Sequence, residues 1–103
     1  LRLPNGQTMT LTADAVVLGR NPAPPADAPE AAAIPVDDAT RTVSKTHALL
    51  RRTETGWTIT DLASTNGVIV GEGETEIAVG TPVAVTGRFL LGDAEFALDA
   101  EAR

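Results

Sequence analysis

Three short segments of this sequence combine a turn with side chains that can hold an anion. Gly19-Arg20 follows an apolar run, Ser44-Lys45-Thr46-His47 precedes another, and Ser64-Thr65-Asn66-Gly67 lies between two more. An arginine guanidinium keeps its charge and presents a rigid fork of donors that matches phosphate oxygens. Hydroxyls and the backbone amides of tight turns donate to the same oxygens, and asparagine can bind an extended peptide backbone. Together the segments predict an anion site built on loops.

Short apolar runs separated by turn residues surround these segments and predict an all-β domain. Asn5-Gly6 predicts a hairpin between 1–3 and 8–11, because both residues accept the positive φ of a tight turn. The other strands are expected at 15–19, 47–53, 57–62, 68–70, 77–79, 83–85, 89–91 and 95–98. About ten short strands in one domain imply a sandwich or a barrel.

Residues 21–35 interrupt the strand pattern with most of the prolines in the chain: Pro22, Pro24, Pro25, Pro29 and Pro35. Closely spaced prolines remove backbone donors and prevent a regular ladder. The segment is therefore predicted to be a mobile Pro/Ala-rich loop insertion at the surface. Near its end, Ile34 and Val36 predict a brief edge strand with Pro35 facing outward.

Length and composition restrict the function. A chain of 103 residues fits one domain, 1–103, and its net charge of −6 argues against nucleic acid and anionic membranes as partners. A local cluster of cations can still capture a charged group, and Arg20, Arg41 and Lys45 lie in or beside the candidate site.

Cysteine is absent, so disulfides and thiolate metal sites are excluded. With no apolar run of about 20 residues, a cytoplasmic location is expected. The first residue is Leu1, so we expect a piece of a longer protein, whose remainder could be membrane-anchored. The frequent alanines and the preference for arginine over lysine suggest a bacterial source.

In this order and at these intervals, the three segments resemble the signature blocks of the forkhead-associated (FHA) domain. The run from Trp57 to Gly67 is also close to that family's usual sequence, and the resemblance extends from about Leu1 to Asp99. It implies a twisted β-sandwich of two antiparallel sheets with about ten to eleven short strands. It also implies recognition of phosphothreonine in a partner protein through loops at one edge.

The resemblance assigns roles to five residues. Arg20 and Ser44 would hold phosphate oxygens, and Thr65 would add a hydroxyl. Lys45, where the family often has Arg or Asn, would add its backbone amide and its charge. Asn66 would hydrogen-bond the peptide backbone and fix an extended strand against the loops.

Other residues would shape or support the site. Thr42 lies in the region that family members use to read side chains downstream of the phosphothreonine. His47 would brace the loops from behind, while Gly19 and Gly67 would permit backbone turns. Val68 departs from the family, which often has Thr there, but no phosphate-holding residue is missing.

Two other functions compete with this one. Ser44 and His47 with Asp37 or Asp61 would supply a hydrolase triad, but no Gly-x-Ser-x-Gly segment is present, so we expect no enzyme, no metal and no cofactor. A phosphate-independent structural or dimerisation domain would be expected to lose Arg20 or Ser44, and both are present. The expected partner is a phosphothreonine-bearing Ser/Thr kinase, its substrate, or the parent chain itself.

Overall fold

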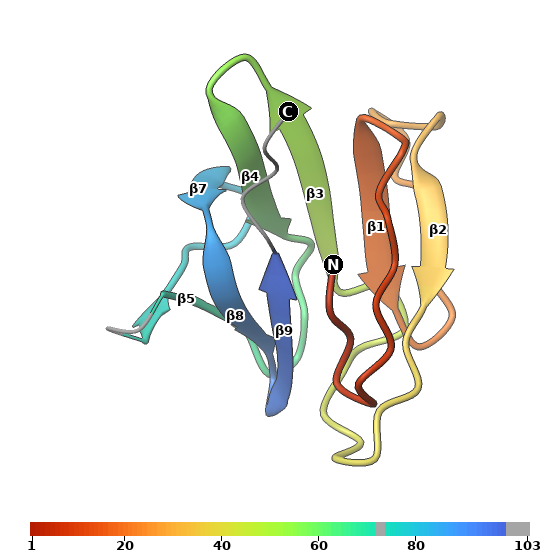
Figure 1. Ribbon diagram of the computed structural model, residues 1–103, viewed down its shortest axis with the longest axis vertical. Helices are drawn as coiled ribbons and strands as arrows, with labels where there is room; N and C mark the ends of the chain where they lie inside the picture. Colours follow the sequence, from red (N-terminus) through yellow and green to blue (C-terminus); the bar gives the residue numbers. More distant parts are fainter. Residues whose placement is uncertain (72–73, 99–103) are drawn as a thin grey trace.

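Nine β-strands make up the regular structure of the described residues, 1–71 and 74–98 of the computed structural model (Figure 1). In chain order they are β1 (Ala15–Gly19), β2 (Ala32–Pro35), β3 (Ala48–Thr53), β4 (Gly56–Asp61), β5 (Val68–Val70), β6 (Thr75–Glu76), β7 (Val83–Val85), β8 (Gly87–Leu91) and β9 (Ala94–Leu98). They form two sheets, with strand orders β2-β1-β3-β4-β7 and β6-β5-β8-β9. The expected β-sandwich is confirmed. Among the described residues, no helix long and apolar enough to cross a membrane occurs.

The described strands are fewer than the ten to eleven expected, because three expected strands, 1–3, 8–11 and 77–79, pair too briefly. The chain does turn at Asn5-Gly6, where Gly6 has a φ of 91°. Across this hairpin, however, only Arg2 and Thr8 form a bridge. The segment expected to form a strand at 77–79 joins β4 through a single bridge between Asp61 and Val79.

The larger sheet is mixed. β1 and β2 run parallel, with Val16 opposite Ala32 and Gly19 opposite Pro35. The expectation of two antiparallel sheets is therefore wrong at this pair. Parallel neighbours require a crossover that returns the chain to the starting edge, and residues 20–31 supply it.

The proline-rich crossover packs on the outer face of the larger sheet. Ala28 is fully buried and Ala31 is 6% exposed. Together with the sheet they form a small second apolar cluster, whose other buried members are Ala15, Val17 and Leu49. Alanine is small enough for the crossover backbone to lie close to the strands, so this face of the sheet is covered by the chain itself.

The predicted 21–35 loop insertion is thus revised in two ways. Its last four residues, 32–35, are strand β2. The preceding residues contain the fully buried Ala28, so they cover the sheet instead of projecting from it as a mobile loop. The edge strand itself has the expected orientation, with Ile34 buried and Pro35 exposed.

The main core lies between the two sheets. It is mostly aliphatic, because the sequence contains only three aromatic residues. Phe89 and Phe96 are the exception. They face each other across β8 and β9, with stacked rings whose centroids are 5.1 Å apart. Such a buried cross-strand pair favours one register of the two strands, because a slip by one residue would turn one of the two rings out of the core.

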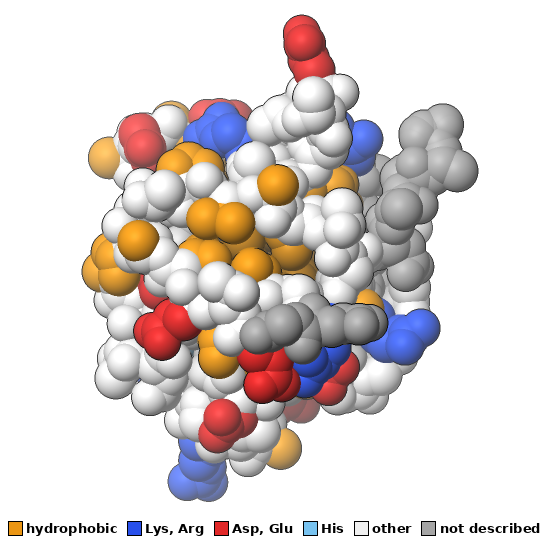
Figure 2. All heavy atoms as spheres, turned by 90° about the vertical axis from the view of Figure 1, so that its left-hand side faces the viewer, with side chains coloured by type: hydrophobic (Ala, Val, Ile, Leu, Met, Phe, Trp, Pro, Cys, Tyr) orange, Lys and Arg blue, Asp and Glu red, His pale blue; other side chains and the backbone are white. Residues whose placement is uncertain are grey.

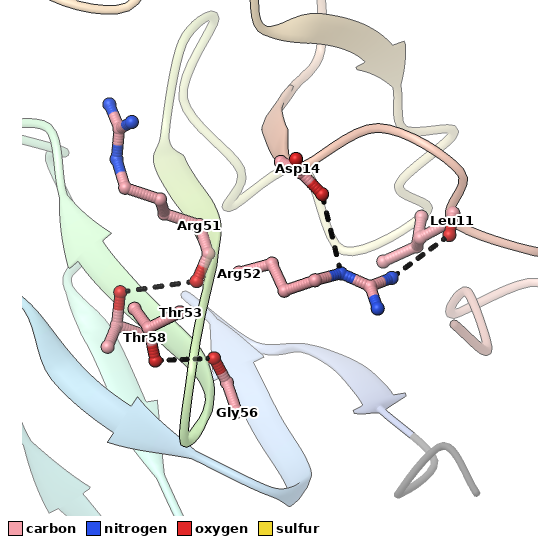
Figure 3. A network of polar contacts seen from close by, with 7 residues as sticks. All are labelled: Leu11, Asp14, Arg51, Arg52, Thr53, Gly56 and Thr58. Atoms are coloured by element: carbon pink, nitrogen blue, oxygen red, sulfur yellow. Dashed lines mark hydrogen bonds and ion pairs between the residues drawn. The ribbon is translucent and has the colours of Figure 1, made fainter. Parts of the chain in front are cut away.

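Trp57 lies half-buried at the margin of the core. The Arg52 guanidinium stands over its ring, 4.8 Å from the centroid. Arg52 also pairs with Asp14 at 3.6 Å and donates to the Leu11 carbonyl at 3.5 Å (Figure 3). These contacts tie the β3–β4 hairpin to the N-terminal segment at the end of β3 away from His47.

One side of the sandwich is less completely closed. The side on which β5 and β7 lie in Figure 1 carries a central group of apolar side chains in Figure 2. Val70 of β5 and Val83 of β7 are only partly buried at the border of the core. Apolar side chains at the border of the core are thus partly exposed on this side.

Replacement of two different alanines by glutamate tests whether the crossover packs on the sheet. We expect Ala28→Glu to lower the free energy of unfolding by roughly 2–4 kcal/mol, because it places an unpaired carboxylate in the apolar cluster. Ala26→Glu adds the same charge at an exposed position of the same segment, so its effect should stay within about 0.5 kcal/mol. Urea unfolding measures both, and equal stabilities would show that the crossover does not pack on the sheet.

Candidate phosphate-binding site

The end of β1 lies directly against the segment that precedes β3. Gly19 is buried, and a Cβ atom on it would stand 2.1 Å from the Lys45 carbonyl oxygen, so only glycine fits. The Arg20 amide donates to the Ser44 carbonyl and the Asn21 amide to the Lys45 carbonyl, both at 3.0 Å. These bonds hold the first two sequence segments together as one unit.

An open depression of about 520 Å³ lies where the three segments meet. It contains all five residues to which the sequence assigned phosphopeptide contacts, and also Thr42. Its lining consists of Arg20, Arg41, Thr42, Val43, Ser44, Lys45, Thr65 and Asn66. Residues 21–35, the predicted insertion, are absent from this lining, so they leave the depression open.

Arg20 is exposed but its side chain is oriented by the backbone. Its Nε atom donates to the Val43 carbonyl at 2.8 Å. This leaves the two terminal amino groups of the guanidinium available to an incoming anion. The anchoring bond reduces the conformational freedom that the side chain would lose on binding.

Ser44, Thr65 and Asn66 are brought together from two loops. The Thr65 amide donates to Ser44 Oγ at 3.0 Å, so the serine hydroxyl hydrogen can still point into the depression. Asn66 Nδ2 donates to the Thr42 carbonyl at 2.9 Å. Its carbonyl oxygen and second amide hydrogen remain able to pair with a peptide backbone.

His47 is fully buried behind the depression and joins the two loops. Its Nδ1 atom accepts a hydrogen bond from the Ser44 amide at 2.9 Å, and Nε2 lies 2.8 Å from the Gly67 carbonyl oxygen. An atom that accepts from an amide carries no proton, so the hydrogen-bond network assigns the neutral tautomer with its proton on Nε2.

Burial lowers the pKa of His47 below the usual 6.5, because the apolar surroundings disfavour the imidazolium. The Gly67 carbonyl and the charges of Asp61 and Asp38 act in the opposite direction and only reduce the shift. The neutral ring is therefore the form that holds the loops at neutral pH.

The third segment folds into a tight turn. Gly67 has a φ of 84°, which strains any residue with a Cβ, and such an atom would also lie 3.0 Å from Glu76 Oε2. Ser64 Oγ accepts from the Gly67 amide at 3.0 Å, and Asp61 Oδ1 accepts from the Ser64 amide at 2.8 Å. The end of β4 thus positions Thr65 and Asn66.

Asp38 organises the loop before β3, and sequence reasoning missed it. Its carboxylate accepts from the amides of Thr40, Thr42 and Val43 at 2.8–2.9 Å and from the Thr40 hydroxyl. Burial alone would raise the pKa of Asp38, but these four hydrogen bonds outweigh it and lower the pKa. The signal in the sequence was Asp-Ala-Thr, because aspartate often bonds the amide two residues on.

Thr42 connects this loop to the β8–β9 turn. The Asp93 amide donates to Thr42 Oγ1 at 2.7 Å, and Thr42 Oγ1 lies 2.7 Å from Thr40 Oγ1. The Thr40 hydrogen already goes to Asp38, so Thr42 donates to Thr40. Gly92 lies against the same side chain, and a Cβ on it would come within 2.6 Å of Thr42 Oγ1. The Thr42 hydroxyl is therefore largely occupied within the domain.

The hydrogen bonds of Ser44 and His47 differ from those of a hydrolase triad. Nδ1 of His47 bonds the backbone amide of Ser44, Nε2 faces the Gly67 carbonyl, and the Ser44 hydroxyl pairs with the Thr65 amide. A general base must be within hydrogen-bond reach of the hydroxyl whose proton it removes. Both ring nitrogens of His47 are engaged elsewhere.

Because burial lowers the pKa of His47, we expect the stability of the fold to depend on pH. The folded state resists protonation of this ring, whereas the unfolded chain takes up the proton near pH 6.5. The contribution of His47 to the free energy of unfolding is thus fully present above about pH 6.5. As the pH falls below this value the free energy of unfolding decreases, by at most about 1.4 kcal/mol per pH unit. Urea unfolding between about pH 5 and 7 measures it, above the range in which ordinary carboxylates titrate.

His47→Asn provides the control, because it does not titrate in this range. We expect it to be less stable at neutral pH, since one of the two hydrogen bonds of the ring is lost, but to show a flat profile between about pH 5 and 7. The same slope in both proteins would contradict the assignment of a neutral, buried His47.

The fold and the site are similar to those of known proteins. The family model of the FHA domain matches residues 16–86. A solved structure of phosphothreonine-dependent FHA domain interactions aligns over 99% of this chain and 95% of its own, with 22% identity and a TM-score of 0.65. No curated protein sequence matches the chain.

Two further solved structures are similar. One is the FhaA FHA domain in complex with the intracellular domain of Rv3910, at 25% identity and a TM-score of 0.61, with 91% of both chains covered. The other is Mycobacterium tuberculosis EmbR in complex with a low-affinity phosphopeptide, at 30% identity and a TM-score of 0.60. That alignment covers 90% of this chain but 22% of EmbR.

The family match extends over more than half of the sequence and includes the three loop segments that line the depression. The chain belongs to the forkhead-associated domain family.

Proposed function

We propose that this domain binds phosphothreonine-containing segments of partner proteins and so docks phosphorylated partners in Ser/Thr kinase signalling. The observation that carries the proposal is the convergence of Arg20, Ser44, Lys45, Thr65 and Asn66 on one open depression. These residues come from three separated segments, yet each offers a donor to the same space. The family and the phosphopeptide and partner complexes of its relatives support the same function.

The chemistry of the depression suits a phosphate. A phosphothreonine carries about −1.5 to −2 charges at neutral pH and presents strong acceptor oxygens. The terminal amino groups of Arg20, the Ser44 and Thr65 hydroxyls and the Lys45 ammonium are donors, while the described lining contains no carboxylate. Charge-assisted hydrogen bonds of this kind contribute roughly 1.5–3 kcal/mol each.

Recognition needs no chemical step, and we propose that the domain is not an enzyme. His47 is the residue best suited to act as a base, but both of its ring nitrogens are hydrogen-bonded to backbone groups. The partner is a phosphorylated kinase, a kinase substrate or another part of the parent protein. Phosphate-independent docking or dimerisation is the alternative, and a comparison of phosphorylated and plain peptides separates it from the proposal.

Replacement of Arg20 tests the phosphate contact. We expect Arg20→Ala to weaken binding of a phosphothreonine peptide by roughly 2–4 kcal/mol, because two charge-assisted donors are lost. Fluorescence anisotropy of a degenerate phosphothreonine library measures this, with the plain threonine library beside it. Arg51→Ala, at an arginine paired with Glu30 outside the depression, is the control and should bind normally. Equal binding of both libraries by the unchanged domain would favour the phosphate-independent alternative.

Asn66 tests the peptide-backbone contact separately. Asn66→Ala should weaken binding by about 1–2 kcal/mol while the preference for the phosphorylated peptide persists, because the phosphate donors remain. Thermal unfolding provides the check on the fold, since the bond from Asn66 to Thr42 is also removed. A collapse of stability with no separate effect on binding would show that Asn66 serves the loop and not the peptide.

A further inference from the structure

Two consecutive peptide units in front of β3 anchor the side chains of Arg20 and Asn66. The Thr42 carbonyl accepts from Asn66 Nδ2 at 2.9 Å, and the Val43 carbonyl accepts from Arg20 Nε at 2.8 Å. A trans peptide unit is planar, so its carbonyl and the amide of the next residue point in opposite directions and turn together. The group that holds the Val43 amide therefore sets the direction of the Thr42 carbonyl, and with it the anchor of Asn66.

Asp38 holds the first of these units from its inner side. Its Oδ2 atom accepts from the Val43 amide at 2.9 Å and from the Thr42 amide at 2.8 Å. Its Oδ1 atom accepts from the Thr40 amide at 2.9 Å, so both oxygens of the carboxylate are fixed. The bonds lower the pKa of Asp38, so the charged form that accepts them is present at neutral pH. The Thr42 carbonyl is thus directed by a charge-assisted bond on the other side of its own peptide unit.

The second unit has a separate anchor. His47 Nδ1 accepts from the Ser44 amide at 2.9 Å. That amide belongs to the same unit as the Val43 carbonyl, on which Arg20 is held. Because this bond does not involve Asp38, the arginine keeps its anchor when the Asp38 carboxylate is removed.

The charge of Asp38 by itself would act against binding. A carboxylate near an anion site repels a phosphate, so loss of the charge alone would strengthen phosphopeptide binding. Asp38 also lies outside the lining of the depression, so its carboxylate acts on a ligand through the loop that it holds. Weaker binding after removal of Asp38 would therefore report lost positioning and not lost charge.

We propose that Asp38 is a positioning residue for Asn66, which contacts the backbone of the bound peptide. It acts through the peptide unit between Thr42 and Val43, whose amide it holds and whose carbonyl receives the Asn66 side chain. This inference rests on the proposed function, and it adds to the site a residue that lies outside the lining of the depression.

Double-mutant cycles on binding of the degenerate phosphothreonine library test this role. We expect Asp38→Ala to weaken binding about five- to tenfold, and Asp38→Asn, which keeps one acceptor oxygen, to weaken it about two- to threefold. In an Asn66→Ala background, Asp38→Ala should change the affinity by less than about twofold, because the side chain that it positions is gone. In a Lys45→Gln background the full effect of Asp38→Ala should persist, because that change removes a phosphate contact instead.

Asp37→Ala is the matched control, because Asp37 is the neighbouring residue, is exposed and lies outside the lining of the depression. It removes the same charge, so its affinity should stay within about twofold of that of the unchanged domain. An affinity of Asp38→Ala equal to that of Asp37→Ala overturns the positioning role and leaves the proposed function intact. The same loss with and without the Asn66 side chain has the same consequence.

The NMR signals of the Asn66 side-chain amide provide a readout that needs no ligand. Asp38→Ala should shift these signals, since the bond to the Thr42 carbonyl loosens, and Asp37→Ala should leave them in place. If Asp38→Ala fails to fold, Asp38→Asn carries the same comparison. Unchanged Asn66 signals overturn the inference alone. Shifted signals, with no phosphopeptide bound by the unchanged domain, overturn the proposed function and with it the role of Asp38 in binding.

Discussion

The two hydrogen bonds of His47 connect the Ser44 loop to the Gly67 turn, and the shape of the depression depends on both. The ring is fully buried; without it the Ser44 amide would lose its partner, whereas the Gly67 carbonyl also accepts from the Gly92 amide at 3.0 Å. Only the neutral tautomer accepts from one loop while donating to the other. A residue with the chemistry of a catalytic base therefore acts as a structural connector between loops twenty residues apart.

The surface charge of the domain is distributed so that an acidic protein can hold an anion. Several of its carboxylates pair with the outer arginines, and two others, Asp38 and Asp61, accept hydrogen bonds from backbone amides. The cations that line the depression, Arg20, Arg41 and Lys45, form no ion pair with the described residues. Placing hydrogen-bonded carboxylates behind the loops, with donors in front, orders the site without neutralising it.

The crossover from β1 to β2 contributes to the same architecture. Its first residues bond the Ser44 loop through the Asn21 and Ala23 amides, and its buried alanines cover the outer face of the larger sheet. Because the chain returns on the covered face and not over the loops, β2 can pair in parallel with β1 while the depression stays open. The prolines restrict the backbone of the crossover and lie outside the lining of the depression.

Local patterns in the sequence determined most strand positions, the Asn5-Gly6 turn and the three segments that meet at the depression, because alternation and turn chemistry act between near neighbours. The sequence did not reveal the parallel pairing of β2, the packing of Ala28 or the role of Asp38. Each depends on which groups meet after folding, as when the Asp93 amide bonds Thr42 from 51 residues away. Only the tertiary structure decided those contacts, because the pairing of distant polar groups is set by the packing of the two sheets and not by the residues beside them.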